Sequence, residues 1–132
     1  METEFLAVPA MGTPTQQAHA RVGAVGRAYL RFAFAETGLF RTAFGGRFDV
    51  DGDAAMNGEA GLNPFEHLNA ALDDLVAAGG LPPERRPGAE YLAWSTVHGM
   101  AMLALDGPLH GVPPAMLDAL GERLLEMVVR GL

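Results

Sequence analysis

Apolar residues recur every three or four positions along almost the whole chain of 132 residues, and no stretch sustains the two-residue alternation of a half-buried strand. Glycines and prolines separate these helical stretches, where they end helices or begin their first turn. The pattern predicts an all-α fold, a helical bundle of about five helices. One core is expected at this length, since single domains commonly contain about 100–150 residues.

The first long helix is expected over residues 15–36. Its apolar stripe keeps to one face because its members are three or four positions apart. The stripe consists of Ala18, Val22, Val25, Tyr29 and Phe32. Arg27 and Arg31 lie roughly opposite and are expected in solvent. Leu30 and Phe34 form an apolar flank that a helix with one buried face does not need, so we expect them to contact something outside this chain.

The middle of the chain is expected to hold two shorter helices. The first covers residues 39–45 and carries Phe44, and a loop rich in Gly and Asp follows over residues 45–61. Asn63 and Pro64 then begin the second helix, with Asn at the cap and Pro at the first position. Its buried stripe is Phe65, Leu68, Leu72, Leu75 and Val76, after which a pair of glycines ends the helix.

The last two helices carry more apolar surface than one subunit needs to bury. They are expected over residues 89–105 and from Pro113 or Pro114 to the chain end. On the second of them apolar residues span about 200°, whereas one buried face needs about 100° or a little more. A twofold homodimer would cover the excess, although a central helix shielded within one subunit remains the alternative. The expected interface is Leu103, Met116, Leu120, Leu124, Met127 and Val128.

Charge and composition exclude several classes of protein. The net charge is −7 and all nine basic residues are Arg, without a basic cluster beyond Arg85–Arg86, so this chain alone is a poor nucleic-acid binder. The absence of cysteine excludes disulfide scaffolds, thiol nucleophiles and thiolate metal sites. Acidic residues at the N-terminus do not fit a signal peptide, and the uncharged residues 91–105 are too few for a membrane span of ~20. We therefore expect a soluble, cytoplasmic protein.

Neither a metal site nor a cofactor is expected. The stretch from Asp49 to Asp53 resembles the start of a calcium loop, but Ala54 and Ala60 stand where that loop requires Gly and Glu. An acidic, solvated loop is the simpler interpretation. The four histidines also lack the i, i+4 pairing of zinc sites; they are His19, His67, His98 and His110.

The helix over residues 89–105 holds the remaining candidates for chemistry. Ser95 and His98 are three positions apart and could touch, but no nucleophile elbow surrounds them. Trp94 and His98 share a helical face, so they either line a pocket or pack in the core with the imidazole bonded to a carbonyl. Gly99 is unfavourable within a helix by ~1 kcal/mol, and close approach of another backbone would explain it.

The segment Trp94-Ser95-Thr96-Val97-His98-Gly99, followed by Leu105-Asp106-Gly107 and a final amphipathic helix, resembles the C-terminal domain of TetR-type transcriptional regulators. The resemblance is to the subgroup with a Trp…His-Gly (WHG) signature. The stretches Tyr29-Leu30-Arg31-Phe32-Ala33 and Leu39-Phe40-Arg41-Thr42-Ala43-Phe44-Gly45 also fit, and the resemblance extends from Thr15 to the C-terminus.

This resemblance implies a domain that senses a small molecule and dimerises, and whose ligand releases a repressor from DNA. Residues 15–132 are expected to form that domain, and residues 1–14 an extension or the remnant of a connecting helix. No helix-turn-helix precedes Thr15, so DNA would be contacted only through a domain that this chain lacks. The expected walls of an apolar or aromatic ligand's pocket are Phe32, Phe44, Phe65, Leu72, Trp94, His98 and Met102, with Tyr29 and His98 as polar anchors.

Two other functions remain open at this point. One is a helical protein–protein interaction module without a small-molecule ligand, which a filled core near Trp94 would favour. The other is a small helical enzyme, which would depend on Ser95 or His98.

Overall fold

The computed structural model describes residues 12–38, 40 and 64–132, and this part of the chain is helical without any strand. Its elements are α2 (Pro14–Ala35), α4 (Pro64–Ala77), the short 3-10 turn η2 (Pro83–Arg85), α5 (Ala89–Asp106) and α6 (Pro114–Gly131). The all-α prediction is confirmed, with four α-helices and one 3-10 turn in the described part. The predicted short helix over residues 39–45 and the loop over residues 45–61, with its calcium-like stretch, lie outside the described residues, apart from Phe40.

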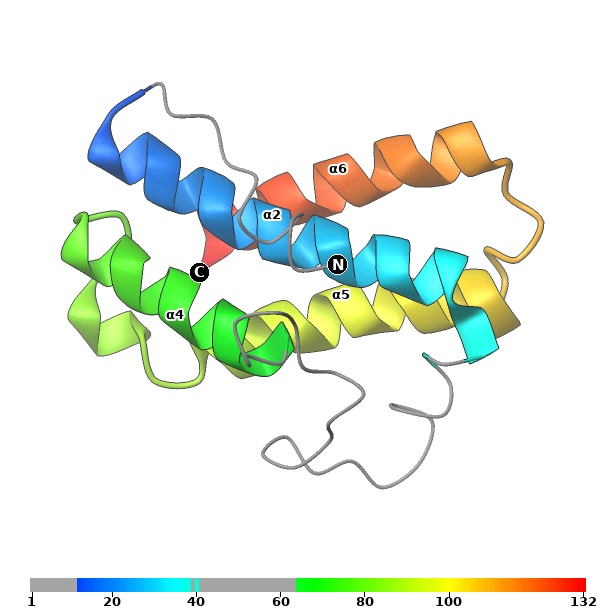
Figure 1. Ribbon diagram of the computed structural model, residues 1–132, viewed down its shortest axis with the longest axis horizontal. Coiled ribbons are helices and arrows are strands. Elements are labelled where there is room, and N and C mark those ends of the chain that lie inside the picture. Colours follow the sequence, from blue (N-terminus) through cyan, green and yellow to red (C-terminus); the bar gives the residue numbers. More distant parts are fainter. Residues whose placement is uncertain (1–11, 39, 41–63) are drawn as a thin grey trace.

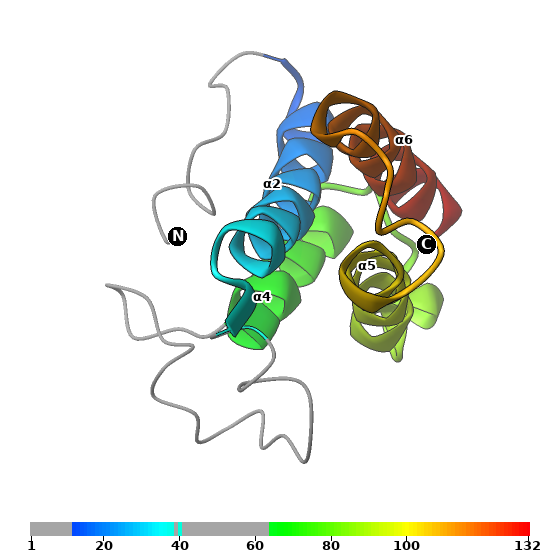
Figure 2. The ribbon, with the colours of Figure 1, turned by 90° about the vertical axis from the view of Figure 1, so that its right-hand side faces the viewer.

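The four helices surround one shared core, with α2 in contact with each of the other three. Seen end-on, α2 and α4 form one side of the bundle and α6 and α5 the other (Figure 2). The side view shows that α6 and α5 run along α2 for most of its length (Figure 1). None of the described helices is long and apolar enough to cross a membrane.

The ends of α2 and α4 are set by local sequence. Thr13 caps α2, since its hydroxyl accepts from the Gln16 amide while the Gln16 side chain accepts from the Thr13 amide. After α4, Gly79 has φ +80°, and the Gly80 amide donates to the Leu75 carbonyl over 2.9 Å. This Schellman ending confirms that the glycine pair terminates the helix.

The core consists of two adjoining clusters. One lies mainly between α2 and α4 and contains Val22, Leu72 and Leu75, and the other joins α2 to α5 and α6 around Tyr29 and Val97. The stripe expected on the first helix is buried at Ala18, Val22, Val25 and Tyr29, whereas Phe32 is half-buried.

The flank formed by Leu30 and Phe34 faces this chain's own core, so the expectation of an outside contact was wrong. Leu30 is buried, and a Cβ on Gly121 of α6 would lie 3.3 Å from its Cδ1 atom. Phe34 packs partly buried against the same cluster. The reason is that α2 is the central helix, so three neighbours bury more of it than one face.

Gly26 and Gly99 lie in opposite surroundings. A Cβ on Gly26 would collide with the Leu125 side chain, so this glycine allows α2 to lie close to α6. At Gly99 a Cβ would meet nothing within 4 Å, so the expected close approach of a backbone is absent within the described chain. Beside the Gly26 contact, Arg27 holds Glu122 of α6 through two hydrogen bonds of 2.6 and 2.9 Å.

Gly99 faces an open apolar groove between α5 and α6. The groove has a volume of about 450 Å³ and is lined by Thr96, Gly99, Met100, Leu103, Leu120, Arg123, Leu124 and Met127. Large apolar side chains are exposed on this outer surface, including Leu92 at 64% and Met127 at 68%. One subunit therefore does not shield α5, and the apolar surplus predicted for the last two helices lies in solvent. We call this surface the α5–α6 face.

Candidate functional site

An apolar pocket lies where the four helices meet. Its volume is about 40 Å³, and its described walls come from every helix of the bundle. They are Val22, Val25, Gly26 and Tyr29 of α2, Pro64, Phe65 and Leu68 of α4, Ala93, Trp94 and Val97 of α5, and Leu125, Val128 and Val129 of α6. The small residues Gly26 and Ala93 leave space that longer side chains would fill.

A chain of polar side chains borders this pocket. The Trp94 Nε1 atom lies 3.3 Å from the Tyr29 hydroxyl oxygen, which in turn lies 2.6 Å from Nδ1 of His98. Because an indole N–H can only donate, the Tyr29 oxygen accepts from Trp94, and its hydroxyl hydrogen is available to donate to Nδ1. This assignment places the hydrogen of a neutral imidazole on Nε2.

Burial disfavours the charged forms of both titratable members of this chain. It raises the pKa of the Tyr29 phenol well above its usual value, an effect that the hydrogen bond from Trp94 opposes only partly. It also lowers the pKa of His98, because partial removal from water disfavours the imidazolium ion. The site is therefore neutral at pH 7, with an imidazole that can accept a hydrogen bond.

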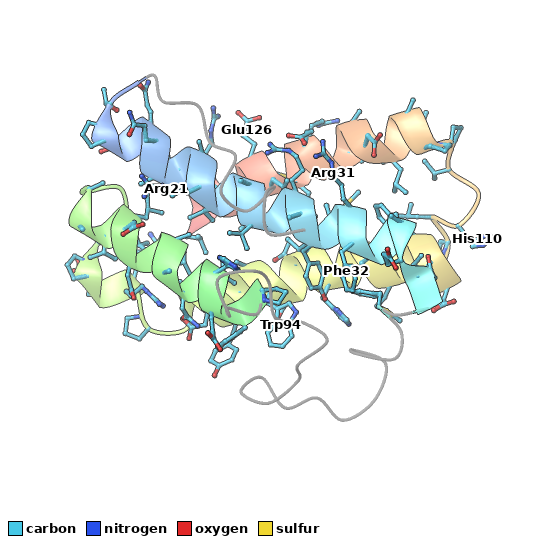
Figure 3. All side chains as sticks on the ribbon, viewed as in Figure 1. Arg21, Arg31, Phe32, Trp94, His110 and Glu126 are labelled. Carbon is cyan, nitrogen blue, oxygen red and sulfur yellow. The ribbon has the colours of Figure 1, made fainter. Side chains whose placement is uncertain are left out.

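Aromatic rings hold this polar chain in place. Phe40 is wholly buried, and its ring centroid lies 5.6 Å from Tyr29 in an edge-on arrangement and 5.7 Å from His98. Phe65 packs against Trp94 with 5.4 Å between ring centroids. In Figure 3 Phe32 and Trp94 lie on the lower side of the bundle, whereas Arg31 and Glu126 lie on the upper side.

The residues expected to bind a ligand fall into three groups. Tyr29, Phe65 and Trp94 line the pocket, and His98 lies behind it, bonded to Tyr29. Phe32 and Met102 pack beside the second core cluster without lining the pocket, while Leu72 is wholly buried in the first. Phe44 lies outside the described residues.

The residues expected at a dimer interface divide as well. Leu103, Met116 and Met127 are exposed, and Leu120 and Leu124 line the groove of the α5–α6 face. Val128 instead lines the pocket. Apolar residues cover such a wide arc of α6 that the sequence pattern did not distinguish the part that faces α2 from the part that faces outward.

Sequence reasoning missed several walls of the pocket. Helical spacing predicts buried positions at Val22, Val25 and Leu68. It does not distinguish a position in the packed core from one that borders a pocket. Leu125 and Val129 belong to the same undivided arc of α6. The glycine at position 26, unfavourable within a helix, was the one available signal of a close contact at this place.

The possible nucleophile pair does not form a catalytic arrangement. Ser95 is exposed, and Tyr29 occupies Nδ1 of His98. The neighbouring Thr96 hydroxyl donates back to the Leu92 carbonyl over 2.7 Å. Among the described residues, no group of three His, Asp or Glu side chains could hold a metal ion.

One family model matches most of the chain. It is described as "Tetracyclin repressor-like, C-terminal domain" and covers residues 22–128, from the third turn of α2 to near the end of α6. No curated protein and no solved structure matches the chain significantly.

Proposed function

We propose that this chain, which belongs to the tetracyclin repressor-like C-terminal domain family, senses a small molecule and forms the homodimer of a transcriptional repressor. The family consists of regulatory domains rather than enzymes, and its members typically bind a ligand and dimerise. The segment from Trp94 to Gly99 supports the finer assignment to the Trp…His-Gly subgroup. In this proposal the repressor acts in the cytoplasm, needs no cofactor, and contacts DNA through a separate domain.

The observation that carries the proposal is the double use of α6. Leu125 and Val128 of this helix line the internal pocket, whereas Leu124 and Met127, each one position earlier, line the groove of the α5–α6 face. A side chain and its neighbour along a helix point about 100° apart, so one helix can serve both surfaces. Any ligand that displaces α6 from α2 would also displace the surface proposed for dimerisation.

A ligand regulates such a dimer only through unequal affinity for its two arrangements. The pocket of about 40 Å³ is far smaller than the ~300–1,000 Å³ of common ligand sites, so in this proposal the described bundle is the closed arrangement. Opening in this proposal uses Phe65, Trp94 and Val128, three walls that are only half-buried. An apolar or aromatic ligand would therefore select a bundle in which α6 lies farther from α2.

The α5–α6 face supports dimerisation through its exposed apolar residues. Isolated monomers rarely expose a contiguous apolar surface of this kind. An isologous contact would pair the two helices with their copies around a twofold axis. Gly99 then becomes explicable, because the space open around it in one subunit is available to a partner's side chains.

Sedimentation of Met127→Glu tests the dimer. We expect the wild-type chain to sediment as a dimer at micromolar concentration, and Met127→Glu to sediment as a folded monomer, because the new carboxylate would be buried without a partner. Ala70→Glu is the matched control: it adds the same charge at an exposed position of α4, away from the α5–α6 face, and should remain dimeric. A monomeric wild-type chain would refute this half of the proposal.

The small size of the pocket also supports a second candidate, a helical interaction module without a ligand. The two candidates differ in their response to apolar molecules. A ligand sensor should gain about 2.7 kcal/mol of stability at a hundredfold excess of ligand over its dissociation constant, seen as a rise in melting temperature. Absence of any rise across a broad library of apolar and aromatic compounds would favour the interaction module.

A further inference from the structure

We infer that the pocket takes an uncharged, largely apolar ligand with a single hydrogen-bonding group, which the Tyr29 hydroxyl and Trp94 N–H recognise. This inference rests on the proposed ligand-sensing function and specifies its ligand class. It excludes ligands that carry a carboxylate or an ammonium ion.

The first argument concerns charge. Within the described walls of the pocket there is no Arg, His, Asp or Glu side chain. Arg27, which follows the pocket wall Gly26 on α2, lies in the outer groove between α2 and α6 and is held by both oxygens of Glu122. A carboxylate that entered the pocket would lose its hydration without gaining an ion pair, and burial of an unpaired ion costs several kcal/mol.

The second argument concerns the polar groups of two residues that line the pocket, Tyr29 and Trp94. The bond from Trp94 to Tyr29 is long, at 3.3 Å, compared with 2.6 Å from Tyr29 to His98. The longer bond is the weaker one. The indole N–H can therefore exchange its hydrogen bond to Tyr29 for one to a ligand oxygen with little loss of free energy. The Tyr29 oxygen, released from the indole, can then accept from a ligand that also donates.

A hydroxyl group satisfies both requirements at once, because it donates and accepts through the same oxygen. It can receive the Trp94 N–H and give its own hydrogen to Tyr29, while Tyr29 keeps its bond to His98. An ether or ketone would satisfy the indole alone. The ring of such a ligand would pack against Phe65 and the branched side chains of Val25 and Val97.

A matched series of one-ring compounds tests this assignment. Toluene, phenol, benzoate and benzylammonium share the same ring and differ in the attached group. Titration calorimetry with the full chain at pH 7, supported by ligand-observed NMR for weak binding, gives each affinity. We expect phenol to bind about two- to tenfold more tightly than toluene, the effect of one net hydrogen bond. Both ions should bind at least about a hundredfold more weakly than phenol.

Two variants locate the effect. Tyr29→Phe removes the hydroxyl and should reduce the affinity for phenol to that for toluene, while toluene binding changes little. Tyr91→Phe is the matched control, since Tyr91 is the chain's other tyrosine and is 60% exposed on α5. Trp94→Phe removes the indole N–H and keeps a ring, and it should also lower the preference for phenol if Tyr29→Phe fails to fold.

The outcomes separate the ligand class from the function. Benzoate or benzylammonium binding as tightly as phenol would overturn the inference and leave ligand sensing intact. Equal affinity for phenol and toluene in the wild-type chain would overturn the role of Tyr29 and Trp94 in recognition. Binding of none of the four compounds would overturn the inference, whereas the sensing function would fall only if the broad library of apolar and aromatic compounds also gave no rise in melting temperature.

Discussion

Gly26 and Gly23 lie one turn apart on α2, yet they have different surroundings. A Cβ on Gly26 would collide with Leu125, which is 4% exposed and cannot move freely. A Cβ on Gly23 would meet nothing within 4 Å. The same residue type therefore provides close helix packing at one position, and at the other it leaves part of the outer groove between α2 and α6 open.

This difference predicts opposite effects of alanine at the two positions. Gly23→Ala should stabilise the chain by up to about 1 kcal/mol, because alanine is the better helix former. Gly26→Ala should be less stable than Gly23→Ala by about 1–3 kcal/mol, since the added methyl group overpacks the contact with Leu125. Urea unfolding of both variants measures the difference. Equal stability would show that α6 yields readily at this point.

His98 supplies a second prediction at the scale of the residue. Its pKa in the folded chain is lowered by burial, so the unfolded chain binds a proton more readily as the pH falls below the ordinary value of about 6.5. Stability attributable to neutral His98 is thus complete above that pH and is lost as the pH falls towards the folded pKa. The wild-type chain should lose more stability between pH 7.5 and pH 5.5 than His98→Gln does. His110→Gln, an exposed position before α6, is the control and should follow the wild type.

At the scale of the element, α6 is the helix that borders the pocket on one face and the groove of the α5–α6 face on another. Leu125 is buried beneath α2 and borders the pocket, while Leu124 is half-buried and borders the groove of the α5–α6 face. The Arg27–Glu122 pair fastens α6 to α2 nearby. This pair is largely in solvent, so it contributes little stability, and the position of α6 depends mainly on apolar packing.

Substitution of the two adjacent leucines should separate the effects of these two faces. Leu125→Ala should destabilise the chain by about 2–5 kcal/mol, because it leaves a cavity in a buried place, and should enlarge the pocket. Leu124→Ala should cost less stability within the subunit and weaken the dimer instead. Chemical denaturation and sedimentation equilibrium measure the two effects. If Leu124→Ala is the more destabilising change and leaves dimerisation unaltered, the assignment of Leu125 to the subunit core and Leu124 to the dimer interface is wrong.

At the scale of the whole molecule, α2 is the central helix and the α5–α6 face is the open surface. The connection from α4 to α5 is fastened by Arg86, which donates to Asp73 over 2.9 Å, to Glu90, and to the Asn69 side chain over 2.9 Å. Neighbouring carboxylates raise the pKa of Arg86 against the effect of burial. This link holds α4 against the start of α5.

Much of the fold follows from local sequence. Helical spacing and the helix-ending glycines predicted α2, α4, α5 and α6, because capping and side-chain periodicity act within a few residues. The family resemblance rests on the contiguous segment from Trp94 to Gly99, and the match over residues 22–128 confirms the family without testing the subgroup. Pairing of Trp94 with His98 on one face was also available from their spacing of four.

Tertiary structure decided what each apolar face meets. Leu30 and Phe34 needed the position of α6 before their flank could be assigned to the core, and Val128 needed it before it could be assigned to the pocket. The bond between Tyr29 and His98 joins residues 69 positions apart, which no helical spacing encodes. Periodicity determines which side of a helix is apolar, but only the packing of helices against one another determines whether that side borders core, cavity or solvent.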